Sequence, residues 1–166
     1  AAGIDGIEHG SGLDAATAEL MAARGVALVP TLDNLEIFPG LADQAEAKYP
    51  LYAAHMRSLY AGRLDAIGRA VEAGVPVYAG TDAGGLRSHG TLAAEIAALA
   101  RLGGPVFAVG AASWRARAWL GQPGLEEGAP ADLVLYDADP RADLGVLRDP
   151  LAVILRGRIV AGRLAR

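Results

Sequence analysis

The 166-residue sequence contains no cysteine, a single lysine and no excess of basic residues. The absence of cysteine excludes disulfide bonds, thiolate nucleophiles and cysteine-ligated zinc, and it is compatible with the cytoplasmic location that we expect. The net charge is −4, with acidic and basic residues interspersed. This balance favours neither nucleic acid nor an anionic membrane as a partner. We also find no signal peptide, and no apolar stretch that approaches the roughly 20 residues of a membrane span.

Several common active-site motifs are missing as well. The sequence has no Gly-rich phosphate loop, no dinucleotide fingerprint, no Gly-x-Ser-x-Gly elbow and no His-x-His pair. What it does have is a hydrophobic fraction of 52% in a chain about one domain long, which is typical of a globular protein with a real core. The chain begins without Met at the threshold of a predicted strand, so we expect it to be cut from a longer protein.

The first two thirds of the chain alternate between short apolar runs and helical patterns. We predict strands over 4–9, 26–30 and 75–79. We predict helices over 15–24, through a long region with a break at Pro50 that ends at Gly74, from Thr91 to about Arg101, and from Pro105 to Leu120. Asp14 is positioned to cap the first helix, and Gly25 to end it. Three strands that are each followed by a helix indicate a parallel α/β sheet.

The pattern changes near Gly121. The run 132–136 is typical of a strand between Pro130 and a polar turn, and 151–160 is typical of a hairpin that turns at 156–158. We therefore predict two domains, an α/β part over 1–121 and a small β part over 122–166.

Three residues that can do chemistry follow the predicted α/β strands. They are His9 in Ile-Glu-His-Gly, Asp82 in Gly-Thr-Asp-Ala-Gly and His89 in Ser-His-Gly. The carboxyl ends of parallel strands face the active site in such folds, so His9 and Asp82 can converge on one point. An imidazole and a carboxylate are suitable ligands for Zn²⁺ or a similar divalent ion, and a carboxylate beside metal-bound water can act as its general base.

Each of these residues also has a purely structural interpretation. A histidine at a strand end is often only hydrogen-bonded to its neighbours. Asp82 before Ala-Gly-Gly can form a turn with its own backbone, and His89 can cap the following helix. Arg87, Arg115 and Arg117 could bind a substrate carboxylate, although solvated surface charge is the simpler interpretation. Spacing alone leaves these alternatives open.

The order of several segments resembles the amidohydrolase superfamily, in particular its imidazolonepropionase-like and prolidase-like branch. The segments are AAGIDGIEHGSGLD, MAARGVALVPTL, AVEAGVPVYAGTDAGG with HGTLAAEIAAL, and GLEEGAPADLVLYDADPRADL with VILRGRIV. The resemblance implies that residues 1–121 are strands 6–8, with their helices, of a (β/α)₈ TIM barrel. It implies that 122–166 are the C-terminal strands of the small β-sandwich domain.

The resemblance also implies roles for individual residues. His9 matches a strand-6 histidine that binds a metal in binuclear members of the family and lies by the metal-bound water or the substrate in mononuclear ones. Asp82 matches a strand-8 aspartate that contacts the metal and moves the proton from the attacking water to the leaving group. His89 lies where substrate contact is expected. The implied reaction is hydrolysis of an amide or peptide C–N bond by metal-activated water, on a dipeptide-like or cyclic amide substrate, with one or two divalent ions, of which Zn²⁺ is favoured.

The remaining family ligands do not occur in this sequence, because the His-x-His of strand 1, the lysine of strand 4 and the histidine of strand 5 would all precede residue 1. We therefore expect this chain alone to be inactive, and to self-associate or to pair with the missing N-terminal half. Two alternatives remain: a degenerate domain that serves as a non-catalytic binding or assembly module, and a deaminase-type member of the same superfamily.

Overall fold

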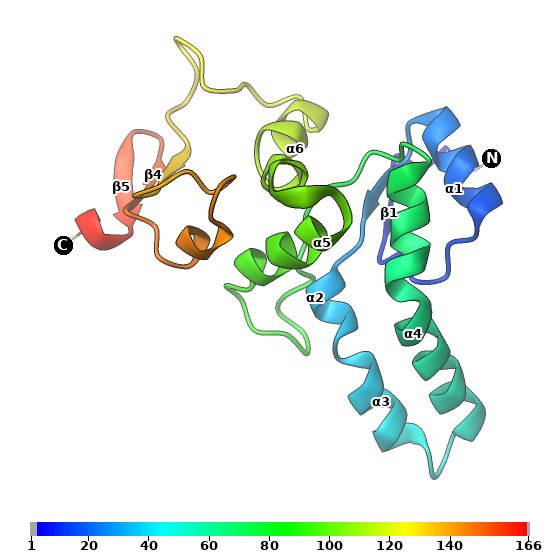
Figure 1. Cartoon of the computed structure of the whole chain (residues 1–166). Helices are drawn as coiled ribbons and strands as arrows, with labels where there is room; N and C mark the ends of the chain where they lie inside the picture. Colours follow the sequence, from blue (N-terminus) through cyan, green and yellow to red (C-terminus); the bar gives the residue numbers. More distant parts are fainter. Residues whose placement is uncertain (1–2, 166) are drawn as a thin grey trace.

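The computed structural model describes residues 3–165, and its longest stretches outside helices and strands are 73–91, between α4 and α5, and 120–132, between α6 and β3 (Figure 1). In chain order they are β1 (Gly6–Glu8), α1 (Ala15–Arg24), β2 (Ala27–Val29), α2 (Leu32–Leu35), α3 (Phe38–Ala45), α4 (Pro50–Glu72), α5 (Leu92–Ala111), α6 (Trp114–Trp119), β3 (Leu133–Leu135), the 3₁₀ helix η1 (Leu144–Arg148), β4 (Ala152–Leu155), β5 (Arg158–Ala161) and the 3₁₀ helix η2 (Arg163–Ala165). The fold is therefore α/β, as the alternating pattern predicted.

The parallel sheet consists of β1 and β2, paired in the register Gly6 to Ala27. The third predicted strand, 75–79, is reduced to one parallel bridge between Leu28 and Val77. Leu28 N–H donates to the Pro76 carbonyl at 2.8 Å, and Tyr78 N–H donates back to Leu28 at 3.0 Å. Pro76 itself has no N–H to donate. Beyond this bridge the chain turns toward the end of α5, because Ala79 N–H donates to the Ala111 carbonyl.

Helix α1 has the two ends that its sequence predicted. The Asp14 carboxylate accepts a hydrogen bond from Thr17 N–H at 2.8 Å, which satisfies a free donor of the first turn. Gly25 takes a left-handed conformation with φ of +65°, which only glycine adopts without steric cost. The turn therefore returns the chain directly into β2.

Helices α3 and α4 form a hairpin that extends away from the rest of the molecule (Figure 1). Pro50 was predicted as a break inside a long helical region, and the break is confirmed, because α3 ends at Ala45 and Pro50 stands at the first position of α4. Its missing N–H costs nothing there, because the first N–H groups of a helix have no intrahelical acceptor. Across the hairpin, Arg57 of α4 pairs with Asp43 of α3 at 2.8 Å.

Helix α5 confirms one predicted break and is followed by a second break that was not predicted. The sequence predicted one helix ending near Arg101 and another over 105–120, and the helical segment that begins at Pro105 ends at Ala111, with α6 separate. Gly104 has non-helical angles (φ 82°, ψ 171°) before Pro105, so α5 is two helical segments joined at a kink. The second break falls at Ser113, which has φ of −140°.

By length and composition α5 is also the one described helix that could cross a membrane. The expectation that no apolar stretch approaches this length was therefore wrong, because the Ala, Leu, Ile, Val and Phe residues of the segment outweigh its two charged residues, Glu95 and Arg101. In this structure α5 carries a fully buried carboxylate, Glu95, and its kink divides it.

The main core lies where α1, α4 and α5 pack around the parallel strands. Its buried members are Ala18, Met21, Leu28, Leu32, Leu35, Ile67, Ala70, Val75, Val77, Ile96, Leu99, Ala108, Val109 and Ala111. Leu28 in β2 and Val77 in the bridge are both fully buried, as expected for a parallel sheet that is covered on both faces. The strand ends are thereby fixed by a packed core.

A separate three-stranded antiparallel sheet, with the order β3-β4-β5, forms the C-terminal part of the chain. The predicted strand over 132–136 and the predicted hairpin are both present, and Arg158 belongs to β5 instead of the turn. Leu144 and Leu147 of η1 pack against the main core. The domain boundary at 121/122 stays a prediction.

Candidate metal centre at the strand ends

The site lies where three neighbouring strand segments end on the same side of the sheet. His9 follows β1 directly, Thr31 follows β2 after Pro30, and Asp82 lies in the loop after the bridge at Val77. His9 N–H donates to the Val29 carbonyl at 2.9 Å, which ties the end of β1 to the end of β2. The structure brings the two predicted ligands together, with 3.9 Å between His9 Nε2 and Asp82 Oδ2.

All three residues have left-handed backbone conformations that non-glycine residues rarely adopt. The φ angles are 65° for His9, 48° for Thr31 and 48° for Asp82. Such a conformation costs on the order of 1–3 kcal/mol per residue, and it is most unusual for a β-branched residue such as Thr31. Strain of this kind gathers at functional sites because the surrounding fold holds it in place.

Two further residues contact the predicted ligands. His9 Nδ1 lies 2.6 Å from Thr31 Oγ1, and Asn34 Nδ2 donates to Asp82 Oδ2 at 2.8 Å. Neither Thr31 nor Asn34 was predicted from the sequence as a site residue. The available signal was a threonine and the only asparagine of the chain within five residues of a strand end, in the segment VPTLDN.

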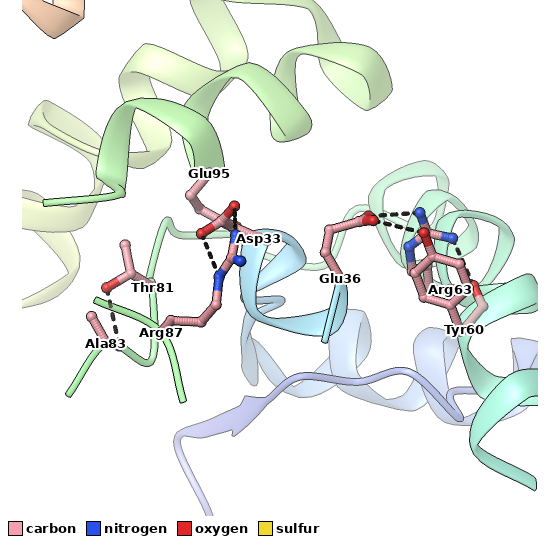
Figure 2. A network of polar contacts seen from close by, with 8 residues as sticks. All are labelled: Asp33, Glu36, Tyr60, Arg63, Thr81, Ala83, Arg87 and Glu95. Atoms are coloured by element: carbon pink, nitrogen blue, oxygen red, sulfur yellow. Dashed lines mark hydrogen bonds and ion pairs between the residues drawn. The ribbon is translucent and has the colours of Figure 1, made fainter. Parts of the chain in front are cut away.

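The short helix α2, which carries Asn34, is held from two sides (Figure 2). Asp33 N–H donates to Glu95 Oε2 of α5 at 2.8 Å, and Arg87 binds the Asp33 carboxylate through both Nε and a terminal guanidinium nitrogen. On the far side, Glu36 accepts hydrogen bonds from Tyr60 and Arg63 of α4, at 2.6 and 2.7 Å. The segment from Pro30 to Leu35 is buried throughout.

Glu95 is a fully buried carboxylate on α5. Its pKa is raised to about 7, first by burial and also by the neighbouring Asp33 charge, against the lowering effect of hydrogen bonds from the Asp33 and Leu32 backbone. Its second oxygen, Oε1, has no hydrogen-bond partner among the described residues. A protonated carboxyl group would therefore be tolerated here near neutral pH.

The other predicted site residue, His89, is not drawn into this arrangement. It is exposed, and its ring lies over Gly84, where an added Cβ would come within 3.3 Å of His89 Nε2. None of the side-chain hydrogen bonds found in residues 3–165 involves His89, so the alternative that it caps α5 was wrong. Substrate contact by His89 stays a prediction.

Two other structural alternatives are also resolved. The turn after Asp82 is closed by Thr81, whose Oγ1 accepts from Ala83 N–H at 3.3 Å, and the Asp82 carboxylate instead accepts from Asn34. Arg87 is not a solvated surface charge, because it is paired with the buried Asp33. Arg117 donates to the Pro123 carbonyl at 2.8 Å, which is a structural contact.

The two predicted ligands fit a divalent ion but do not complete its coordination. Two ligands of one zinc ion lie at most about 4.2 Å apart, since each bond is roughly 2.1 Å long. The distance of 3.9 Å is within this reach, and both side chains remain accessible, at 43% for His9 and 56% for Asp82. In the part of the chain that the structure describes, no group of three or more His, Asp or Glu side chains could hold a metal ion.

A sequence profile of the amidohydrolase family matches residues 1–160. The chain therefore belongs to the amidohydrolase family. Among its relatives, a protein of Mycobacterium tuberculosis is 60% identical over 158 residues, which are 95% of this chain and 42% of that protein. Ochratoxinase of Aspergillus niger is 32% identical, over 92% of this chain and 32% of that enzyme.

Solved structures agree with this membership. A Xaa-Pro dipeptidase with methionine in its active site superposes with a TM-score of 0.82 at 28% identity, over 96% of this chain and 40% of that chain. A prolidase in complex with N-methylphosphonate-L-proline gives 0.79 at 29% identity, over 97% of this chain and 41% of the prolidase. The chain thus spans less than half of the length of these relatives, and it forms part of an amidohydrolase fold.

Proposed function

We propose that this chain is the C-terminal part of a metal-dependent amidohydrolase that hydrolyses amide or peptide C–N bonds. The observation that carries the proposal is the approach of His9 and Asp82, which come from different strand ends and lie 73 positions apart in the sequence. Family membership supports a hydrolase, and the carboxyl ends of parallel strands are where such folds place their chemistry. The (β/α)₈ barrel around these strands is part of the proposal.

His9 Nε2 and an Asp82 oxygen would hold a divalent ion together with ligands that these 166 residues do not supply. When bound, such an ion supplies Lewis acidity, which lowers the pKa of water and polarises an amide carbonyl. The Asp82 carboxylate would take a proton from the attacking water and return it to the leaving nitrogen. Its exposed position leaves one face open to a substrate.

The substrate class that we propose is dipeptide-like or N-acyl. The support is indirect: solved relatives include a Xaa-Pro dipeptidase and a prolidase with a phosphonate analogue of a proline dipeptide, and another relative is ochratoxinase. His89, in the exposed loop that follows the isolated bridge at Val77, would contact the substrate. A cyclic amide remains within the same proposed reaction.

A non-catalytic binding or assembly module is the competing function. The observation that favours it is that the described residues hold two predicted ligands, whereas a catalytic zinc normally takes three protein ligands and a water.

A deaminase-type reaction would use His9 and Asp82 in the same places, so substrate assays must decide between amide hydrolysis and deamination.

The function is best tested in a chimera that replaces the matching 158 residues of the M. tuberculosis relative with this chain. We expect the chimera to hydrolyse members of a panel of Xaa-Pro dipeptides and N-acyl amino acids, and to lose this activity when a chelator is added. The rate of hydrolysis should fall at least 100-fold in Asp82→Ala and in His9→Ala. The intact relative is the positive control. A chimera that folds and hydrolyses the panel equally well with Asp82→Ala would contradict the proposal, and release of ammonia from a ring substrate would favour a deaminase.

Self-association, or pairing with an N-terminal half, is proposed for the chain alone. An open groove of about 400 Å³ lies beside β1 and α1, lined by apolar residues such as Ile4, Leu20 and Met21. Sedimentation velocity is expected to show dimers or larger species. A monodisperse monomer at all concentrations would contradict this expectation.

A further inference from the structure

The segment that follows β2 contributes no predicted metal ligand, yet it contacts both of them. Thr31 reaches the His9 ring at Nδ1, and Asn34, three residues later, reaches the Asp82 carboxylate at Oδ2. Thr31 is 1% exposed and Asn34 is 8% exposed, so both are anchored in the interior, whereas the two groups that they contact are accessible.

The Thr31 hydroxyl does not make the capping hydrogen bond that its position predicts. Thr31 is the N-cap of α2, where a threonine side chain usually accepts a hydrogen bond from the second or third N–H of the helix. Here it makes no such bond. Glu95 of α5 accepts from Asp33 N–H instead, which leaves the hydroxyl free to face His9.

From this arrangement we infer that Thr31 and Asn34 are positioning residues, which hold His9 Nε2 and the Asp82 carboxylate facing one another as a pair of ligands. The inference rests on the proposed metal centre. An ion at Nε2 would take the lone pair of that nitrogen, so Nδ1 would carry the proton and donate it to Thr31 Oγ1, which can accept because a hydroxyl oxygen has lone pairs. A fixed ligand orientation of this kind is worth about 10–100-fold in metal affinity.

The rest of α2 explains how this segment can orient other groups. Asp33 is held by Arg87 and Glu95, and Glu36 is held by Tyr60 and Arg63 (Figure 2). The helix is thus fastened to the loop after the bridge strand, to α5 and to α4. A hydrogen bond orients its partner only if its own anchor is rigid, and this condition is met here.

The composition of the chain makes the test direct, because it has three histidines and a single asparagine. Long-range ¹H–¹⁵N spectra of the metal-free chain would follow both ring nitrogens of His9, with His55 and His89 as internal references. Thr31→Val keeps the side-chain shape and removes the hydroxyl, whereas Thr31→Ser keeps the hydroxyl. Thr91→Val is the matched control, since Thr91 Oγ1 is buried without a partner among the described residues.

We expect Thr31→Val to shift the Nδ1 resonance of His9 and to leave His55 and His89 unchanged, with Thr31→Ser and Thr91→Val close to the wild type. The side-chain amide of Asn34 is expected to shift in Asp82→Ala. In a Zn²⁺ titration of the chimera with the M. tuberculosis relative, Thr31→Val and Asn34→Leu should each lower the zinc affinity about tenfold, whereas Thr31→Ser should keep the affinity of the unsubstituted chimera.

The two proposals fail in different ways. A folded chimera that takes up no zinc would contradict the metal centre, and the metal-free spectra of the chain would then decide the positioning inference alone. If His9 Nδ1 does not respond to Thr31→Val in a chain that unfolds at the wild-type temperature, the inference is overturned. Unchanged zinc affinity in both Thr31→Val and Asn34→Leu would overturn it as well.

Discussion

Unfavourable backbone conformations occur both at the strand ends of the parallel sheet and in the turn of the C-terminal hairpin, but in different surroundings. Three of the four non-glycine residues with positive φ in the described chain, His9, Thr31 and Asp82, lie at the strand ends, next to a fully buried core. The fourth, Arg156, lies in an exposed two-residue turn beside Gly157. At the strand ends the packed core holds the strained backbone of residues whose side chains form the candidate site. In the hairpin the strained residue is exposed and belongs to no candidate site.

Polar side chains show the same contrast. Near the strand ends Asp33, Asn34 and Glu95 are buried and hydrogen-bonded to neighbouring elements. In the C-terminal sheet the ion pairs are exposed, as between Arg141 and Asp139 or Arg163 and Asp149. Exposed pairs contribute about 0–1 kcal/mol each. The stability of the strand ends therefore depends on burial, and that of the C-terminal sheet depends mainly on backbone pairing.

The largest expected difference between the two regions is in the response to shortening an apolar side chain. Leu28→Ala, in the fully buried strand β2, is expected to cost about 2–5 kcal/mol of unfolding free energy. Leu155→Ala, at the 53% exposed end of β4, should cost less than about 1 kcal/mol. Urea denaturation of both variants measures the difference. Equal losses would show that the parallel strands do not form the main core.

The next effect concerns Glu95 and pH. Its pKa is raised from 4.5 to about 7, so between these values the folded state binds more protons than the unfolded state, and stability falls as pH rises through this window. Glu95→Gln should remove this dependence and be about 1–3 kcal/mol more stable than the wild type at pH 8. The amide can still accept from Asp33 N–H.

Denaturation at pH 5 and pH 8 measures this effect, and Glu126→Gln, at an exposed position, is the matched control. If Glu95→Gln is less stable than the wild type at pH 8, the ionised carboxylate stabilises α2 by more than its burial costs. The contrast between the two regions would then have to be revised.

The smallest effect is expected in the hairpin. Arg156 and Gly157 both have positive φ, as the two central residues of a type I′ turn require, and asparagine suits the first of these positions better than arginine. Arg156→Asn should raise the unfolding free energy by about 0.5–1 kcal/mol. Its backbone N–H would keep the bond to Asp132 at 2.7 Å. A thermal melt below that of the wild type would contradict this estimate.

The sequence predicted those parts of the structure that depend on local signals. The cap at Asp14, the end of α1 at Gly25 and the C-terminal hairpin were all predictable from nearby residues. The approach of His9 and Asp82 was predictable because both follow apolar strands. Amidohydrolase membership, first suggested by a resemblance, is confirmed.

What could not be predicted depends on contacts between distant residues. The contact of Thr31 with His9 spans 22 positions, and that of Asp33 with Glu95 spans 62. The third predicted strand forms only a single bridge, because Ala79 at its C-terminal end donates a hydrogen bond to Ala111 at the end of α5. No local sequence pattern predicts this contact. The pairing of Arg87 with Asp33 is of the same kind.

The most direct test of the account is a calorimetric titration of Zn²⁺ into the metal-free chimera with the M. tuberculosis relative, which supplies the ligands that this chain lacks, beside its His9→Ala, Asp82→Ala and control His55→Ala variants. The account predicts that the chimera and its His55→Ala variant bind zinc, and that binding is about 100-fold weaker in the other two variants, because each removes one of the two proposed ligands. Unchanged affinity in His9→Ala or Asp82→Ala, or no binding by a folded chimera, would contradict the claim that these strand ends form part of a metal centre.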